Sequence, residues 1–191
     1  MIELGIGLVL LVLLGLVVVL VGWAIVTYNS LVGLRNQLDN AWAQIDVQLK
    51  RRYDLIPNLV EAVKDYMGFE QDVLTKVTEA RSQAAAATGP ADQARAENVL
   101  TGALRQLFAV VENYPQLKAN ENVMRLQEEL TGTEDRISSA RQFYNENVRV
   151  YNTRVQTFPT ALIAGVLGFR AREFFATGDD AEREPVKVDL R

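Results

Sequence analysis

The chain has 191 residues and a net charge of −4 at pH 7, from 20 basic and 24 acidic side chains. It contains no cysteine and no histidine, which excludes disulfide bonds, thiolate chemistry, zinc-finger sites and imidazole as a general base or metal ligand. The acidic balance also argues against a general nucleic-acid-binding protein, so we expect no nucleic-acid partner.

An uninterrupted apolar stretch, Leu4 to Val26, dominates the N-terminal region. A helix of about 20 apolar residues spans a hydrocarbon core of roughly 30 Å, so this stretch is long enough to cross a bilayer. We predict a single transmembrane anchor helix over residues 1–27. Trp23 and Tyr28 are then expected at the membrane interface, where the helix leaves the lipid.

A cleaved signal peptide is the main alternative to an anchor. It would need a basic residue before the apolar stretch and a small-residue cleavage site after it. Only Met1, Ile2 and Glu3 precede the stretch, and no such cleavage site follows it. An uncleaved anchor is therefore the prediction.

The basic residues near the anchor indicate its orientation. Arg35, followed by Lys50, Arg51 and Arg52, lies on the C-terminal side, and no basic residue lies on the other side. The positive-inside rule then favours a cytoplasmic position for the bulk of the chain. The opposite, extracytoplasmic side stays open because the margin is small.

The remaining chain predicts an all-α body. Apolar residues recur at steps of three and four, and proline or glycine separates the periodic segments. Pro57 is expected to kink or end the first helix, and Asn120 is expected to cap the fourth. The predicted helices cover residues 31–56, 58–87, 92–113, 121–158 and 160–176, with a short connector at 116–119. We expect the first of them to continue the anchor helix without a break.

Helices joined by short connectors favour an antiparallel up-and-down four-helix bundle over residues 28–176, ending in a short apolar C-terminal helix. Residues 177–191 lack a core-forming pattern and are predicted to form a flexible tail.

Alternating helix directions bring the last apolar segment, Leu162 to Phe175, back toward the membrane. Arg170 and Arg172 would then meet lipid headgroups. The open alternative is that its aromatic side chains plug the end of the bundle. The candidate lipid-surface residues are Leu162, Phe169, Arg170, Arg172 and Phe174.

Two further groups are candidates for a partner surface. Arg51 and Arg52 could bind an acidic patch of a partner, or could stabilise the C-terminal end of their own helix. Asn145 and Asn152 follow tyrosines seven residues apart and could form a polar recognition stripe. Alternatively, the tyrosine rings lie in the core and the asparagines fix the register.

Several ordered motifs resemble the LemA family of bacterial membrane proteins, over Tyr28 to Phe175. The motifs are RRYDLIPNLV from Arg51, VKDY from Val63, LFAV from Leu107, YPQLKAN from Tyr114, LQEELT from Leu126, EDRI from Glu134, and YNT from Tyr151. The resemblance implies an N-terminal membrane helix followed by a four-helix bundle, in the inner membrane of a bacterial cell. It implies no activity.

The residues provide no sign of catalysis. Helical-bundle carboxylate metal sites use Glu-x-x-His pairs, which this chain lacks, and it contains no P-loop, dinucleotide fingerprint or EF-hand loop. We therefore expect no enzyme activity, no metal, no cofactor and no small-molecule substrate.

Two functions are open. The first is a membrane-anchored scaffold or adaptor that presents helical faces to other membrane proteins or to itself. The second is an element that shapes or organises the lipid surface through the anchor and residues 160–176. The expected partners are the lipid bilayer and either membrane proteins or further copies of the chain.

Overall fold

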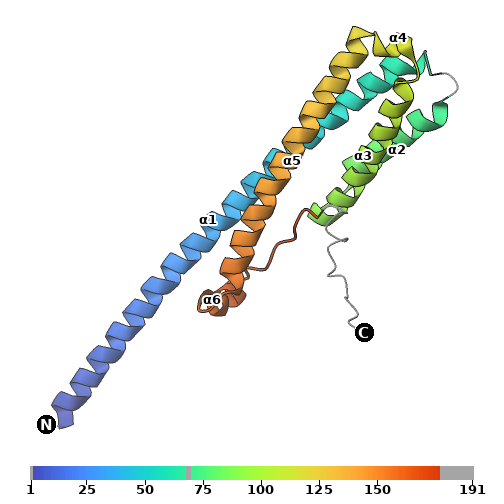
Figure 1. Ribbon diagram of the computed structural model, residues 1–191. Coiled ribbons are helices and arrows are strands. Elements are labelled where there is room, and N and C mark those ends of the chain that lie inside the picture. The colour runs from blue at the N-terminus through green and yellow to red at the C-terminus, as the bar shows by residue number, and fades with distance from the viewer. Residues whose placement is uncertain (1, 68–69, 177–191) are drawn as a thin grey trace, which may run out of the picture. The chain divides into compact units, whose positions relative to one another are not determined.

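The computed structural model describes residues 2–67 and 70–176, and no strand occurs among them. The all-α prediction is confirmed, whereas the predicted flexible tail at 177–191 lies outside the described residues. Figure 1 shows the helices, which are α1 (Ile2–Lys64), α2 (Gln71–Ala86), α3 (Pro90–Val111), α4 (Pro115–Lys118), α5 (Glu121–Gln156) and α6 (Thr160–Val166).

We expected Pro57 to kink or end the first helix, and the structure excludes the end, because α1 continues to Lys64. Proline lacks the N–H that would bond to the carbonyl four residues earlier, which here belongs to Tyr53. Arg81 compensates, because its Nε donates to the Tyr53 carbonyl at 2.7 Å. The prediction that the second helix begins at residue 58 is therefore wrong, and α2 begins at Gln71.

The other helix boundaries follow recognisable signals. Gly89, at φ 82°, precedes Pro90 at the first position of α3, which confirms the predicted break there. Asn120 caps α5, since its Oδ1 accepts from the backbone N–H groups of Asn122 and Val123 at 3.0 and 3.3 Å. The connector expected at 116–119 lies mostly within a single helical turn, α4, which covers Pro115–Lys118.

The last helix is much shorter than the predicted 160–176, because α6 ends at Val166. Gly168 adopts φ 75°, and the N–H of Phe169 bonds to the Ala164 carbonyl at 2.9 Å. The Gly168 N–H bonds to the Gly165 carbonyl, which completes a Schellman-type stop. The chain then runs without regular structure from Gly168 to Ala176.

The contacts divide the chain into two compact units. The first contains α1 up to Asn40, α5 from Glu146, α6 and the chain up to Arg172. Its buried side chains lie on one face of α1 and on α5, α6 and the segment that follows. They are Thr27, Leu31, Leu38, Val148, Tyr151, Val155, Thr160, Ala164 and Phe169.

The second unit contains the rest of α1, then α2, α3, α4, α5 up to Asn145, and the chain from Glu173. Consecutive long helices run in opposite directions (Figure 1), so the predicted antiparallel four-helix bundle is confirmed. A continuous apolar cluster, which includes Ile56, Leu59, Val77, Leu100 and Leu107, fills its centre.

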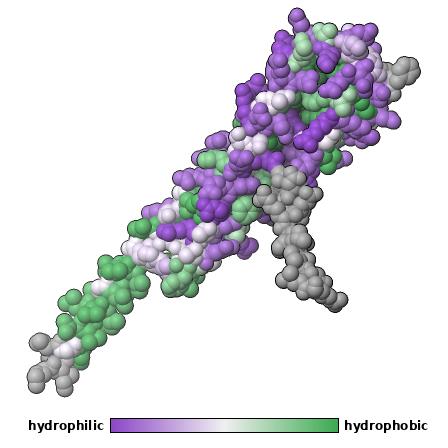
Figure 2. Space-filling view, viewed as in Figure 1, coloured by the Kyte–Doolittle hydropathy of each residue, from purple (hydrophilic) through white to green (hydrophobic). Residues whose placement is uncertain are grey.

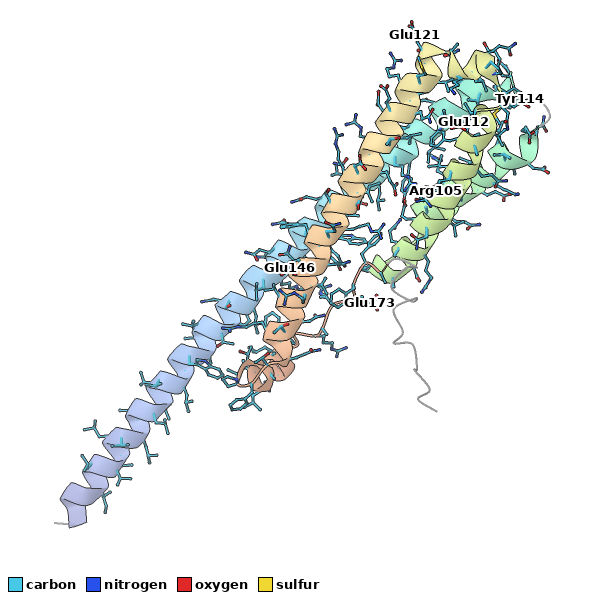
Figure 3. The ribbon with its side chains drawn as sticks, viewed as in Figure 1. Arg105, Glu112, Tyr114, Glu121, Glu146 and Glu173 are labelled. Carbon is cyan, nitrogen blue, oxygen red and sulfur yellow. The ribbon has the colours of Figure 1, made fainter. Side chains whose placement is uncertain are left out.

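The apolar run at the start of α1 packs against nothing in the structure. Every leucine, isoleucine and valine from Ile6 to Val26 that has a described side chain is at least 51% exposed. Figure 2 shows this end of α1 as a continuous hydrophobic surface, and in Figure 3 its side chains project without a neighbouring helix. Within the described chain, α1 is the one helix long and apolar enough to span a membrane, by length and composition.

Candidate functional site

A layer of buried charge crosses the apolar core of the second unit. The guanidinium of Arg52, which is 3% exposed, lies 2.9 Å from carboxylate oxygens of both Glu97 and Glu134. Its second nitrogen donates to the Thr101 hydroxyl at 2.8 Å. Because Arg52 comes from α1, Glu97 and Thr101 from α3, and Glu134 from α5, one side chain ties three helices together.

Tyr53 and Gln93 extend this layer to α2. The Tyr53 hydroxyl donates to Glu97, and the Gln93 amide donates to the Tyr53 oxygen at 2.8 Å and to the α2 carbonyl of Ala84 at 3.0 Å. All four long helices of the bundle therefore meet in one polar network, which we call the buried polar layer.

Burial governs ionisation in this layer. It raises the pKa of the Glu97 carboxyl, although Tyr53, Arg52 and Gln93 act in the opposite direction. Burial and the neighbouring Glu97 carboxylate also raise the pKa of the Tyr53 hydroxyl, which therefore keeps its proton at neutral pH. Arg52 and Glu97 are almost inaccessible to solvent, so neither side chain is placed to meet a ligand, whereas Glu134 is partly exposed.

The structure separates the two arginines predicted at a partner surface. Arg51 is half exposed and makes a long rim contact with Glu129 at 3.7 Å. Arg52 is buried and its guanidinium is held by three side chains, so its assignment to a partner surface is corrected. Its charge cannot reach a partner without unfolding the bundle.

The two predicted asparagines bind backbone of this same chain. Within the first unit, the Asn152 amide pairs with both backbone polar groups of Arg172, at 2.8 and 2.9 Å. Within the second, the Asn145 amide pairs in the same way with Phe175, at 2.8 and 3.1 Å. Tyr144 and Tyr151 are both buried, as in the alternative that places their rings in the core.

The residues predicted at the membrane lie in different environments. Tyr28 is 45% exposed and contacts Phe169 edge to face, with the ring centroids 5.9 Å apart, while Trp23 is half-buried. Phe169 is buried by this packing and therefore does not face solvent or lipid. Exposed side chains of the predicted set are Leu162, Arg170, Arg172 and Phe174.

A shallow groove of about 620 Å³ lies between α1 and α5 in the second unit. Small side chains, among them Ala43, Ser139 and Ala140, form part of its floor. Val47 and Phe143, which are 63% and 52% exposed, flank it. We call this the α1/α5 groove, which our sequence analysis did not predict.

Sequence reasoning also missed Gln93, Glu97 and Thr101, although a signal for them exists. In α3 the buried positions 93, 97, 100, 104, 107 and 111 follow strict steps of four and three. Charged Glu97 occupies one of these core positions. The apolar Val99, in contrast, is 56% exposed.

Replacing Arg52 with methionine tests the buried polar layer. At pH 7.5, Arg52→Met should lower the free energy of unfolding by roughly 3–5 kcal/mol, because Glu97 keeps its charge without its main cation. The matched variant Arg51→Met removes an exposed charge and should change it by less than about 0.5 kcal/mol. Urea unfolding of the full chain in detergent, followed by circular dichroism at 222 nm, measures both.

The deficit of Arg52→Met should also depend on pH. A raised pKa means that the folded state binds more protons than the unfolded state, so stability is lost as pH rises through the raised value. The difference in free energy of unfolding between Arg52→Met and the unaltered chain should therefore become smaller as pH falls toward the ordinary glutamate pKa of about 4.3. An equal loss of unfolding free energy in Arg52→Met and Arg51→Met would contradict the assignment of Arg52 and Glu97 to a buried ion pair. A loss in Arg52→Met that does not change with pH would contradict it too.

Comparisons with known proteins identify a family and several relatives. The model of the LemA family matches residues 41–190. Protein LemA of Metamycoplasma hominis is 28% identical over 165 residues, covering 84% of this chain and 73% of the relative. Magnetosome protein MamQ 2 of Paramagnetospirillum magneticum is 24% identical over 185 residues, covering 83% and 68%.

A second magnetosome relative, MamQ of Magnetospirillum gryphiswaldense, is 24% identical over 174 residues, with 78% of this chain and 64% of the relative covered. The family match covers most of the chain and includes the buried polar layer. This chain belongs to the LemA family.

Proposed function

We propose that this protein is a single-pass, membrane-anchored and non-enzymatic scaffold that presents helical faces to other membrane proteins or to copies of itself. The exposed apolar run of α1 supports the anchor, since its length matches a bilayer core. The absence of histidine and cysteine from the sequence supports a role in contact, because these residues supply most bases, nucleophiles and metal ligands.

The anchor would lie in the cell membrane, with the body on the cytoplasmic side. Support for this side comes from Arg35, a basic residue close behind the apolar run.

The α1/α5 groove carries the scaffold proposal. Amphipathic helices bind other proteins by laying an apolar face into such grooves, and its volume lies within the range of roughly 300–1,000 Å³ found for ligand sites. Gln48 Oε1 lines the same groove, is buried and accepts no hydrogen bond from any described residue. A partner helix with a polar donor would satisfy this oxygen while its apolar side chains cover Val47.

Site-specific photo-crosslinking tests this face. Ser139 lines the groove, whereas Ser82 is an exposed serine on α2 outside it. With a benzophenone amino acid at position 139, membranes should yield one discrete crosslinked species, either with a membrane protein or with a second copy. The same label at position 82 should yield none.

A groove-filling substitution provides the control. Ala140→Phe should reduce the adduct from position 139 at least several-fold, whereas Ala85→Phe, on exposed α2 surface, should leave it unchanged. Equal labelling from positions 82 and 139, or an adduct indifferent to Ala140→Phe, would refute the groove as the docking face.

A second candidate function is organisation of the lipid surface by α6. Phe158, Leu162 and Val166 are spaced four residues apart and are 76%, 66% and 86% exposed. The contact between Tyr28 and Phe169 holds the end of this segment beside the point where α1 would leave the lipid. Exposed apolar side chains at that level suit the interfacial layer of a bilayer.

Fluorescence quenching by spin-labelled lipids tests this candidate. The chain has no cysteine, so Leu162→Cys gives a single labelling site on α6, and Val150→Cys gives an exposed control on α5 in the same unit. In vesicles, headgroup spin labels should quench a fluorophore at position 162 and not one at position 150. Absence of quenching at both positions would contradict a contact between α6 and lipid. The role of α6 would then be to cover the end of the pair formed by α1 and α5.

A further inference from the structure

A small pocket of about 260 Å³ opens on the first unit, separate from the α1/α5 groove. Arg35 of α1, Tyr151 of α5 and the segment Gly168–Arg172 line it. Its volume lies below the range of roughly 300–1,000 Å³ that drug-sized ligands occupy, so it suits a small ion or a headgroup.

Positive charge exceeds negative charge around this pocket. It is lined by Arg35, Arg170 and Arg172, and among the described residues Asp39 is the carboxylate that forms ion pairs with them. Asp39 lies 3.6 Å from the Arg172 guanidinium and 4.0 Å from that of Arg35, which are long contacts shared by two cations. Arg170 makes no ion pair with any residue that the structure describes. Guanidinium groups bind phosphate through paired, charge-assisted hydrogen bonds.

Tyr151 supplies a neutral donor to the same space. Its side chain is 2% exposed and lines the pocket, and its hydroxyl makes no hydrogen bond to any residue in ranges 2–67 and 70–176. The hydroxyl oxygen is not among the buried atoms of the described chain that lack a partner, so it is open at the pocket and can donate to a ligand oxygen there.

The pocket lies close to the level at which α1 would leave a membrane. Phe169, one of its lining residues, packs on Tyr28. Arg35 follows Val26, the last residue of the apolar run, by about 13 Å along the helix. Helical side chains lean toward the N-terminus of their helix, and a long arginine can extend toward a headgroup layer that is roughly 5–7 Å thick.

We propose that this pocket binds a phosphate group, as presented by the headgroup of an anionic phospholipid or by a free phosphate ion. Arg35, Arg170 and Arg172 neutralise the phosphate charge, and the Tyr151 hydroxyl donates to one of its oxygens. The lipid source rests on the membrane anchor proposed above, whereas recognition of the phosphate group does not.

Nuclear magnetic resonance of the arginine Nε–Hε groups tests the site in the full chain, held in zwitterionic micelles. Three probes are added separately: inorganic phosphate, phosphatidylglycerol, and oleate as an anionic lipid without phosphate. Saturable shifts of the Arg35 and Arg170 signals are expected with a phosphate-bearing probe and not with oleate. The Arg154 signal, from exposed α5 surface, should not move.

Variants check that the pocket produces the shifts. Arg170→Gln should raise the half-saturating concentration, read at Arg35, by about fivefold. Tyr151→Phe, which preserves packing and removes one hydroxyl, should raise it by at least twofold. Arg154→Gln makes the same charge change outside the pocket and should leave it unaltered.

Each probe separates one source from another. Shifts with phosphatidylglycerol alone, or with both phosphate probes, support a lipid ligand, and shifts with inorganic phosphate alone support a soluble one. No saturable shift, an equal response to oleate, or an equal response at Arg154 would overturn the proposal. Failure of the membrane anchor alone would remove the lipid response and leave the inorganic phosphate response intact.

Discussion

The structure depends first on the apolar run of α1, which has no protein partner. From Ile6 to Val26 its large apolar side chains remain mostly exposed, although burial of each would stabilise the chain by about 1.5–3 kcal/mol. No surface of the described chain covers them. A bilayer can, and a helix satisfies its own backbone hydrogen bonds there. The proposed anchor would make the rest of the molecule a body tethered to lipid.

The second unit gains its specificity from the buried polar layer. An entirely apolar four-helix bundle can shift its helices by a turn at modest cost, because leucine and isoleucine contacts are broadly interchangeable. Arg52 removes that freedom, since a one-turn shift would separate its guanidinium from Glu97 and leave both charges buried without partners. A correct register also aligns α1 with α5, and so forms the walls of the α1/α5 groove.

Much of the fold could be predicted from local signals. The apolar run is continuous in the sequence, and the break at Gly89 and the cap at Asn120 each depend on a few neighbouring residues. The continuation of α1 past Pro57 was not predicted, because Arg81, which donates to the Tyr53 carbonyl, lies 28 residues from Tyr53 in the sequence. The end of α6 at Val166 was not predicted for a different reason. Glycine is often tolerated in a helical pattern, and only the positive φ of Gly168 identifies the stop.

The candidate sites were harder to predict, because each joins residues distant in sequence. Arg52 and Glu97 occupy apolar-stripe positions, a pattern that indicates a buried pair, but the pairing itself appears only once the helices are packed. Asn145 was a candidate either for a partner surface or for fixing the register, and it binds the backbone of Phe175, 30 residues further on. The proposed ligand-binding role of Arg35 could not be predicted from the sequence, because it depends on the chain after α6, which places Arg170 and Arg172 in the same pocket.

The most direct test of this account is extraction of cell membranes at pH 11. The intact chain should remain in the membrane pellet, and a variant with Leu13→Arg and Val17→Arg should be released, because each central arginine costs roughly 2.5–3.5 kcal/mol of insertion free energy. Recovery of the unaltered chain in the supernatant, or of a product lacking residues 1–27, would contradict the account.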